Sequence, residues 1–242
     1  MVSLKPNITD LIFTLGLGED LVGVTSYCQL PQNRNLDRIA DYVHVDVERV
    51  MALKPTLVLG SEENSSKKEI NFLHAKGIRV ELFPFRTLAE TRQSILKMAL
   101  LLGKEERGRK IGADMDAALG KIKKEGSKKT LIVVGTNPLI VAGERTLLGD
   151  LLEWVGGKNA AAGSKLRYPI YSLEKLVASQ PEVIVDLSMG TEGKSRDSEI
   201  YRRFPSLPAV QSNQIYFLDM NHFPASPGMV QGARELAKVL EK

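Results

Sequence analysis

The sequence predicts an α/β protein of two similar lobes, each built on a mostly parallel sheet, bridged by a long helix. Three observations lead to this prediction. Residues 45–59 and 171–185, which lie 126 positions apart, match as two copies of one unit. Short β-branched runs alternate with amphipathic segments, a pattern typical of parallel sheets with crossover helices. Between the two lobes the pattern is purely helical. A cleft between such lobes is a natural place for a ligand.

The repeated unit reads as a capped helix followed by a buried strand. A capping residue is followed two places later by a glutamate and then by Arg or Lys. Apolar positions at helical spacing come next, and a proline before a β-branched run ends the helix. The matched pairs are Asp46 and Ser172, Glu48 and Glu174, and Pro55 and Pro181.

The first lobe is expected over residues 1–86, with strands and helices in alternation. The expected strands are Val2–Leu4, Leu21–Thr25, Leu57–Leu59 and Ile78–Phe83. The expected helices are Asn7–Leu15, Asp46–Leu53 and Ser65–Ala75. Glycines after the first and last of these helices are the usual helix stop signals.

The connection is expected over residues 87–126. Thr87 and Glu90 have the spacing of a capping box, which predicts the start of a helix. As a helix, Lys104–Lys124 would span about 30 Å, enough to carry the chain from one lobe to the other. A helical hairpin on the surface is the alternative.

The second lobe is expected over residues 127–242 and repeats the alternation. Its expected strands are Thr130–Val134, Val183–Leu187 and Gln214–Leu218. Its expected helices are Thr146–Val155, Ser172–Ser179, Ser198–Phe204 and Pro227–Leu240.

Composition narrows the class of function. The net charge is +4, but the 33 lysines and arginines are scattered and aromatic residues make up only 6%. Nucleic-acid binding is therefore not expected, because it requires a clustered basic surface. Cys28 is the only cysteine, which excludes an intrachain disulfide and a cysteine-based metal cluster. No apolar run approaches the ~18 residues of a membrane span. No signal-peptide pattern precedes Val2, so we expect a cytoplasmic protein or one whose leader has been removed.

Motifs for catalysis and phosphate binding are weak. The loop Ser188–Ser195 lacks the first glycine of a P-loop and reads as a solvated Gly/Ser loop. No Gly-x-Ser-x-Gly elbow is present. Three dispersed histidines do not predict a metal site, although His44 and His222 could face a ligand. We therefore expect no enzyme, no cofactor and no bound metal, with a cytoplasmic α/β enzyme as the alternative.

Tyrosines and arginines gather in loops beside the expected strands and repeat helices. Tyrosine offers a flat apolar ring with a polar tip, which suits a large, partly hydrophobic ligand. Loops at one end of a parallel sheet are the usual ligand sites of α/β folds. Arginines in the same loops could pair with ligand carboxylates or phosphates. The alternative is that these loops are simply solvated. The residues are Tyr27, Tyr42, Tyr168, Tyr171, Arg34, Arg38 and Arg167.

The chain resembles the class III periplasmic binding proteins, the substrate-binding components of ABC importers for vitamin B12, ferric siderophores and haem. The likeness covers nearly the whole chain and is greatest to the vitamin B12-binding members. It is carried by residues 2–10, Gly23–Pro31, Val47–Leu59, Gly135–Pro138, Gly143–Glu144, Tyr168–Glu174 and Ala225–Pro227.

The resemblance implies a corrinoid ligand, delivered to a membrane permease by a monomeric protein outside the cytoplasm. One glutamate per lobe, Glu48 and Glu174, would dock into arginine pockets on the permease. Two large rings of the vitamin B12-binding members are lost here, near Ser61 and at Ile140, so haem or a ferric siderophore is the alternative ligand. The expected ligand contacts are Tyr27, Tyr42, Ile140, Arg167, Tyr168, Asn221 and His222, the last two beside an aligned Asp near Asp219.

Overall fold

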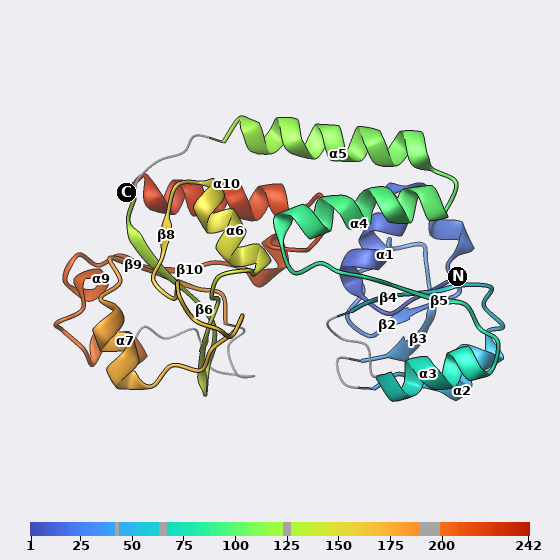
Figure 1. Cartoon of the computed structure of the whole chain (residues 1–242), viewed down its shortest axis with the longest axis horizontal. Coiled ribbons are helices and arrows are strands. Elements are labelled where there is room, and N and C mark those ends of the chain that lie inside the picture. Colours follow the sequence, from blue (N-terminus) through green and yellow to red (C-terminus); the bar gives the residue numbers. More distant parts are fainter. Residues whose placement is uncertain (42–43, 63–66, 123–126, 189–198) are drawn as a thin grey trace. The chain divides into compact units, whose positions relative to one another are not determined.

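The computed structural model describes residues 1–41, 44–62, 67–122, 127–188 and 199–242 (Figure 1). The chain divides into two compact units. Unit 1 comprises residues 1–113 and 225–227, and unit 2 comprises residues 114–224 and 228–242. Each unit contains one five-stranded sheet. The prediction of an α/β protein with two mostly parallel sheets is confirmed.

The sheet of unit 1 has the order β3-β2-β1-β4-β5, and every neighbouring pair is parallel. One strand, β3, was not expected, and Arg38 lies in it rather than in a loop. The strands are β1 Val2–Ser3, β2 Gly23–Thr25, β3 Asp37–Ala40, β4 Val58–Ser61 and β5 Val80–Phe83.

Helices cover both faces of this sheet. Figure 1 shows α2 and α3 on one face and α1 and α4 on the other. Val50 of α2 and Leu73 of α3 pack against Val2 and Val58 in one buried cluster. The helices are α1 Pro6–Thr14, α2 Val47–Ala52, α3 Lys67–Ala75, α4 Leu88–Leu101 and α5 Glu105–Gly120, with a 3-10 turn η1 at Gly18–Asp20. The division between the units falls within α5. This helix is shorter than the expected 104–124 segment: it runs from Glu105 to Gly120.

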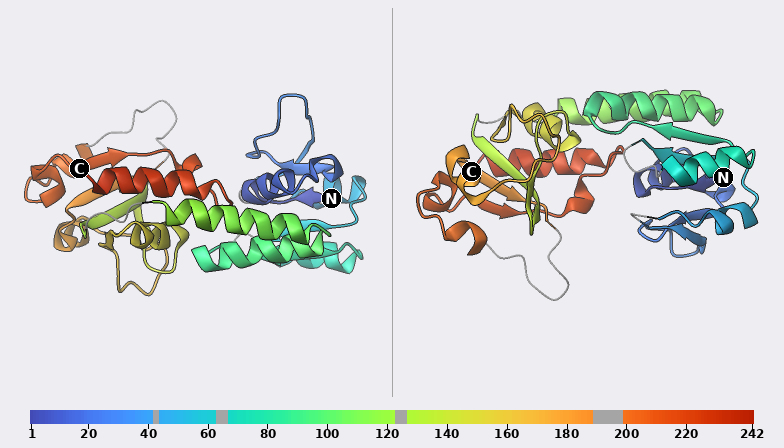
Figure 2. Two further views of the ribbon diagram at one scale, coloured as in Figure 1. Left: turned by 90° about the horizontal axis from the view of Figure 1, so that it is seen from above. Right: turned by 60° about the horizontal axis from the view of Figure 1, so that its bottom comes forward.

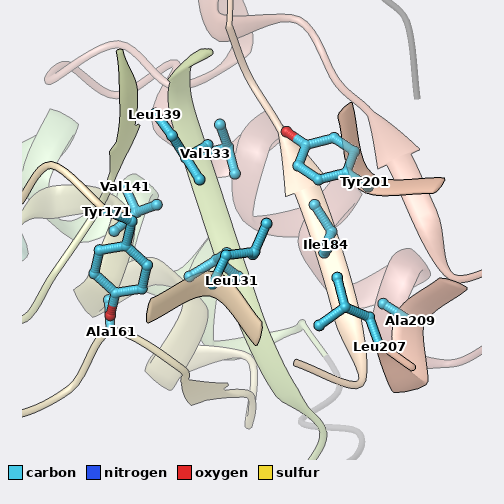
Figure 3. Close-up of a cluster of buried hydrophobic side chains, with 11 residues drawn as sticks. Leu131, Val133, Leu139, Val141, Ala161, Tyr171, Ile184, Tyr201, Leu207 and Ala209 are labelled. Carbon is cyan, nitrogen blue, oxygen red and sulfur yellow. The ribbon is translucent and has the colours of Figure 1, made fainter. Parts of the chain in front are cut away.

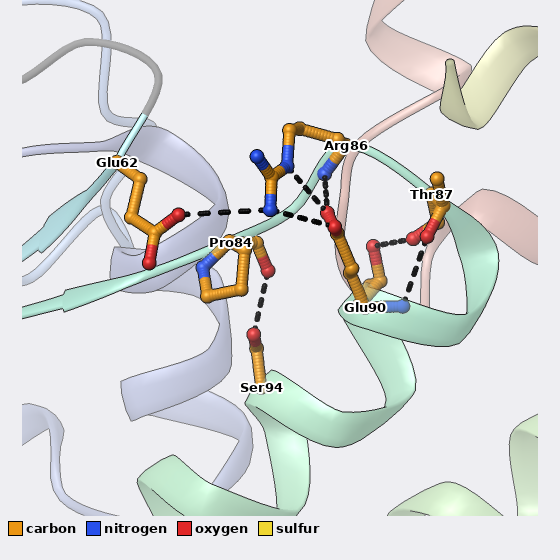
Figure 4. Close-up of polar contacts among 7 residues, drawn as sticks. Glu62, Pro84, Arg86, Thr87, Glu90 and Ser94 are labelled. Atoms are coloured by element: carbon orange, nitrogen blue, oxygen red, sulfur yellow. Dashed lines mark hydrogen bonds and ion pairs between the residues drawn. The ribbon is translucent and has the colours of Figure 1, made fainter. Parts of the chain in front are cut away.

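The start of α4 is fixed by reciprocal capping (Figure 4). Thr87 Oγ1 accepts a hydrogen bond from the backbone N–H of Glu90 at 3.1 Å. The Glu90 carboxylate accepts from the backbone N–H of Arg86, one residue before the capping residue, at 2.9 Å. Ser94 Oγ donates to the Pro84 carbonyl at 2.6 Å. The expected helix start at Thr87 is therefore confirmed, with the glutamate reaching one residue further back than in a capping box.

The sheet of unit 2 has the order β10-β9-β6-β7, and β8 also pairs with β6. All pairs are parallel except β6 with β7. Strands β7 and β8 were not expected, because both are short and β7 follows β6 through a tight hairpin at residues 137–138. The strands are β6 Lys129–Thr136, β7 Leu139–Val141, β8 Lys158–Asn159, β9 Val183–Asp186 and β10 Ile215–Phe217.

The core of unit 2 has one cluster between the sheet and its short helices (Figure 3). Leu131 and Val133 of β6 and Ile184 of β9 pack there with Tyr171 and Tyr201. Helices α6 and α10 cover the opposite face (Figure 1). The helices are α6 Leu147–Trp154, α7 Leu173–Ser179, α8 Glu199–Arg202, α9 Pro208–Gln211 and α10 Met229–Leu240, with a 3-10 turn η2 at Met220–His222. Further ribbon views are given in Figure 2.

Both copies of the repeat form the same local structure. Asp46 Oδ1 accepts from Arg49 N–H at 2.9 Å, and Ser172 Oγ accepts from Lys175 N–H at 3.2 Å. The residue before each proline has a left-handed backbone, with φ of 46° at Lys54 and 42° at Gln180. Such values are uncommon outside glycine, and here they turn the chain from α2 into β4 and from α7 into β9. The helix stops predicted at Pro55 and Pro181 are confirmed.

Two glycines in α5 should respond oppositely to alanine. A Cβ on Gly108 would lie 2.2 Å from Ala99 Cβ, whereas a Cβ on Gly112 meets nothing nearer than Leu96 Cδ2 at 3.9 Å. Gly108→Ala should destabilise the protein by about 1–3 kcal/mol through overpacking. Gly112→Ala should stabilise it by up to about 1 kcal/mol through helix propensity. Urea unfolding of both variants measures the difference, and equal shifts would contradict the close packing of α5 on α4.

Candidate functional site

The carboxyl ends of the parallel strands in unit 1 meet at one edge, which carries one of the expected ligand residues, Tyr27, among charged side chains. Tyr27 lies two residues after β2 and is 47% exposed. Ser61 ends β4, and Glu62 and Arg86 follow β4 and β5. Arg86 lies 3.7 Å from Glu62 Oε2 and 2.7 Å from Glu90 Oε1 (Figure 4). The edge therefore combines an exposed aromatic ring with a charged network. Tyr42 lies outside the described residues.

The loop that carries Tyr27 is anchored by a buried polar cluster. Cys28 is 4% exposed, and its Sγ lies 3.1 Å from Thr9 Oγ1 and 3.0 Å from Thr25 Oγ1. Thr9 Oγ1 also donates to Ser3 Oγ at 2.8 Å. Since buried polar groups need hydrogen-bond partners, this cluster fixes the start of the loop against β1 and α1.

Two of the candidate arginines, Arg34 in the loop after β2 and Arg38 in β3, anchor this loop. Arg38 Nη1 donates to the carbonyl oxygens of Thr25 and Cys28, both at 2.8 Å. Arg34 forms an ion pair with Glu19 and donates to the Gly18 carbonyl at 2.8 Å. These guanidinium groups hold the segment after β2 to the rest of unit 1, a role that the sequence did not reveal.

An open depression runs along β3 in unit 1. It is lined by Asn35, Leu36, Asp37, Arg38 and Arg49. Arg49 lies 3.4 Å from Asp37 Oδ1 and donates to the Arg38 carbonyl at 3.2 Å. Its charged groups thus contact one another, and Arg38 is the only one of the residues expected to meet a ligand that lines it.

In unit 2 the expected ligand residues lie on three segments. Ile140 is half-buried in β7 and forms an isolated bridge with Ile170. Arg167 is half-buried, and its carbonyl accepts from Gly143 N–H at 2.7 Å. Tyr168 is 48% exposed. Asn221 and His222 belong to η2, which follows the carboxyl end of β10.

His222 is held by α10. Its Nδ1 lies 2.7 Å from Glu235 Oε1, and its side chain is 36% exposed. A Cβ on Gly232 would lie 2.6 Å from the His222 carbonyl oxygen and 2.4 Å from the Phe223 ring. The glycine therefore allows η2 to pack directly on the backbone of α10. The sequence did not reveal Glu235 as the partner, because 13 residues and a turn separate it from His222.

A buried carboxylate, Asp186, ends β9, and the sequence did not reveal it either. Asp186 is 1% exposed and accepts from Ser188 N–H at 2.8 Å, Ser188 Oγ at 2.5 Å and Tyr201 OH at 2.6 Å. Figure 3 shows the Tyr201 ring over β9. Burial, and next the charge of Asp186, raises the pKa of Tyr201 far above its ordinary value. The sequence does contain one signal for this contact: Asp186 ends an otherwise apolar strand pattern. A carboxylate buried at such a position needs a hydrogen-bond partner.

The two matched glutamates lie in the first turns of α2 and α7 and are exposed. A carboxylate at this position is favoured by the helix dipole. The hydrogen bond from the Ser172 side chain, followed by one from the backbone, lowers the pKa of Glu174. Both acids are therefore exposed at helix starts that side chains cap.

The described part of the chain shows neither a metal-binding cluster nor a membrane-spanning helix. No group of three or more His, Cys, Asp and Glu side chains among them could hold a metal ion. None of the helices in the described ranges combines the length and apolarity needed to cross a membrane.

Comparison with known proteins gives consistent matches. A family model described as periplasmic binding protein matches residues 1–221. A vitamin B12-binding protein from Photorhabdus laumondii is 27% identical over 197 residues, which are 79% of this chain and 71% of that protein. A periplasmic heme-binding protein from Roseiflexus sp. RS-1 superposes with a TM-score of 0.86 at 27% identity, covering 99% of this chain and 96% of the other. A periplasmic heme-binding protein from Vibrio cholerae has a TM-score of 0.87 at 22% identity, covering 100% and 98%, and supports the fold alone.

The Asp186–Tyr201 pair predicts a loss of stability at alkaline pH. In the unfolded chain a tyrosine ionises near pH 10, whereas the raised pKa keeps Tyr201 protonated in the folded protein. The contribution of Tyr201 is fully present below pH 10 and should fall by about 1.4 kcal/mol per pH unit above it. Tyr201→Phe should remove this slope and lower stability at pH 7 by about 1.5–3 kcal/mol, since it removes a hydrogen bond to a charged group.

Urea unfolding between pH 7 and 11 measures both effects. Tyr216→Phe is the matched control, because its hydroxyl donates to a neutral partner, Gln214 Oε1, at 2.8 Å in a half-buried position. The control should lose less stability at pH 7. A Tyr201→Phe variant with the wild-type alkaline slope would contradict the assignment.

Proposed function

The chain belongs to the periplasmic binding protein family, and on that premise we propose that it captures a corrinoid and delivers it to the permease of an ABC importer. The family comprises binding components of transport systems, so the chain is a binding protein rather than an enzyme. The observation that carries the proposal is the match over residues 1–221, together with 27% identity to a vitamin B12-binding protein. Haem or a ferric siderophore is the second candidate cargo, favoured by the loss of large rings near Ser61 and at Ile140.

The proposed ligand contacts come from both units. Tyr27 and Tyr168 support this role, because each presents a ring that is about half exposed, 47% and 48% respectively. Such rings can pack against a corrin face while their hydroxyls meet its amide side chains. Arg167, Asn221 and His222 would add polar contacts, and Ile140 an apolar one. Tyr42 completes the proposed set.

Docking to the permease is assigned to Glu48 and Glu174. Three features support this proposal: both acids occupy the same place in the repeat, both are exposed, and both helix starts are fixed by side-chain caps. A pair of carboxylates on rigid helix starts suits a partner with two arginine pockets, because guanidinium groups bind carboxylates in a fixed geometry. Residues 87–126 are proposed as the helical connection between lobes 1–86 and 127–242. We further propose a monomer located in the periplasm or anchored outside the cell membrane.

Ligand titration tests the cargo. We expect saturable binding of cyanocobalamin at micromolar or lower concentration, measured by isothermal calorimetry, with weaker or no binding of haemin and ferric siderophores. Binding of haemin or a siderophore alone would replace the corrinoid with the second candidate. Failure of all three classes would contradict the function itself.

Charge reversal tests the docking assignment. The double variant Glu48→Lys and Glu174→Lys should abolish stimulation of the permease's ATPase while leaving ligand affinity unchanged, because the acids lie on helix starts rather than among the proposed ligand contacts. The assay uses the importer reconstituted in proteoliposomes with ligand-loaded binding protein.

The matched control is the double variant Glu106→Lys and Glu153→Lys. Both residues are exposed, one lies in each unit, and the change in net charge is the same. This control should stimulate the permease's ATPase as the wild-type protein does. Equal loss in both double variants would show a general charge effect, and lost ligand affinity in the first would place Glu48 or Glu174 in the ligand site.

A further inference from the structure

Several exposed apolar side chains lie close together in unit 2. Among the described residues, nine large apolar or aromatic side chains are exposed, and four of these fall within residues 166–173. Soluble proteins usually carry such residues singly, so a run of them indicates a binding surface. We call these four the apolar strip: Leu166, Tyr168, Ile170 and Leu173, which are 65%, 48%, 63% and 48% exposed.

The backbone of the strip is fixed. Backbone groups of Arg167, Pro169 and Tyr171 form hydrogen bonds to β7 or to Gly143 just beyond it, at 2.7, 3.1 and 2.8 Å. The segment thus lies along β7 in an extended form, in which successive side chains point to opposite sides. Pro169 and Tyr171 are buried on one side. The side chains exposed on the other side are Leu166, Tyr168 and Ile170.

The strip ends beside one of the proposed docking acids. Leu173 is the first residue of α7, and Glu174 is the second. Exposed lysines, Lys165 and Lys175, lie just outside the two ends of the strip. An apolar centre with a charged rim is the usual composition of a protein–protein interface.

The repeat in unit 1 carries no such strip in its described residues. Ala40 is 8% exposed, His44 is exposed but polar, and Val47 is half-buried against the core cluster. Tyr42 lies outside the described residues. These four positions are 126 residues before those of the strip. Because both copies form the same local structure, that structure does not require the strip, and its exposure in unit 2 has another reason.

We propose that the apolar strip docks against an apolar patch on the outer face of the permease, with Ile170 and Leu173 as the central contacts. The inference rests on the proposed function and deepens it by adding an apolar contact to the docking charge of Glu174. Continuity with this acid favours the permease over a lipid surface or a second copy, because Leu173 must approach whatever surface its neighbour binds. Salt screens the charge but not the apolar contact.

Affinity for the importer tests the proposal. The double variant Ile170→Gln and Leu173→Gln should bind the importer in proteoliposomes at least about 10-fold more weakly than the wild type, as expected when two central apolar side chains of an interface are lost. The ratio should persist as the salt concentration rises. Cyanocobalamin affinity, measured by calorimetry, should be unchanged, because the variant keeps Tyr168.

The matched control is the double variant Leu96→Gln and Leu100→Gln. These leucines lie on α4 of unit 1 and are 42% and 62% exposed, so the chemical change is the same on another surface. The control should bind the importer as the wild type does. Equal loss in both double variants would show a general surface effect and overturn the proposal.

A second measurement does not depend on the glutamine variants being folded. Ile170→Cys is labelled with an environment-sensitive dye, and Leu100→Cys carries the same dye as the control. Adding the importer should shift the emission of the first dye to the blue and leave the second unchanged, because only the first enters an apolar contact. No shift at position 170 would contradict the proposal.

The other occupants of the strip give distinct results, each of which would overturn the proposal. Strip-dependent binding to vesicles without the importer would assign the strip to a lipid surface. A wild-type dimer that the glutamine variant loses would assign it to a second copy. Loss of cyanocobalamin affinity with unchanged importer affinity would assign it to the cargo.

Failure of this proposal and failure of the proposed function are distinguishable. If the wild type and the strip variant bind the importer equally, the strip has no docking role, while the docking of Glu174 and the binding role stand. If the wild type binds cargo but not the importer, docking fails and the binding role stands. If it binds neither the importer nor any of the three cargo classes, both proposals fall.

Discussion

Parallel pairing of β4 with β1 and of β9 with β6 is the constraint on which each unit depends. Parallel strands cannot be joined by a tight turn, so each connection must cross the sheet, and helices supply most of these crossovers. The crossovers place helices on both faces of each sheet and direct every parallel strand's carboxyl end to one edge. Tyr27, Ser61 and Arg86 in unit 1, and Asp186 and His222 in unit 2, share such edges for this reason alone.

The sequence was most informative where structure is determined locally. Caps at Asp46, Ser172 and Thr87 are satisfied within a few residues, so their pattern alone predicts the helix starts. Strand β3 was missed because its exposed Asp37 and Arg38 do not give an apolar run, and it forms only through pairing with β2. The Asp186–Tyr201 and His222–Glu235 contacts join separate elements, and no spacing rule connects them.

Charged residues near the candidate site have two different roles: some hold the backbone in place and others remain exposed to a partner. Arginines that appeared free to meet a ligand in the sequence, Arg34 and Arg38, instead hold the loop after β2. The matched glutamates lie in the first turns of their helices, where Glu174 also accepts a hydrogen bond from Ser172, and their exposure leaves them available to a partner. Family membership establishes the kind of protein, whereas the identity of the cargo depends on a few side chains at strand ends.

The burial of Cys28 makes this chain convenient for spectroscopic work. Its thiol is 4% exposed and lies within 3.1 Å of two threonine hydroxyls, so alkylating dyes and spin labels should react with it slowly. A pair of cysteines introduced on exposed helix faces, one in each unit, would then carry the probes without removal of the native thiol. Fluorescence energy transfer between two dyes, or electron–electron double resonance between two spin labels, would then report the distance between the labelled positions as cargo is added.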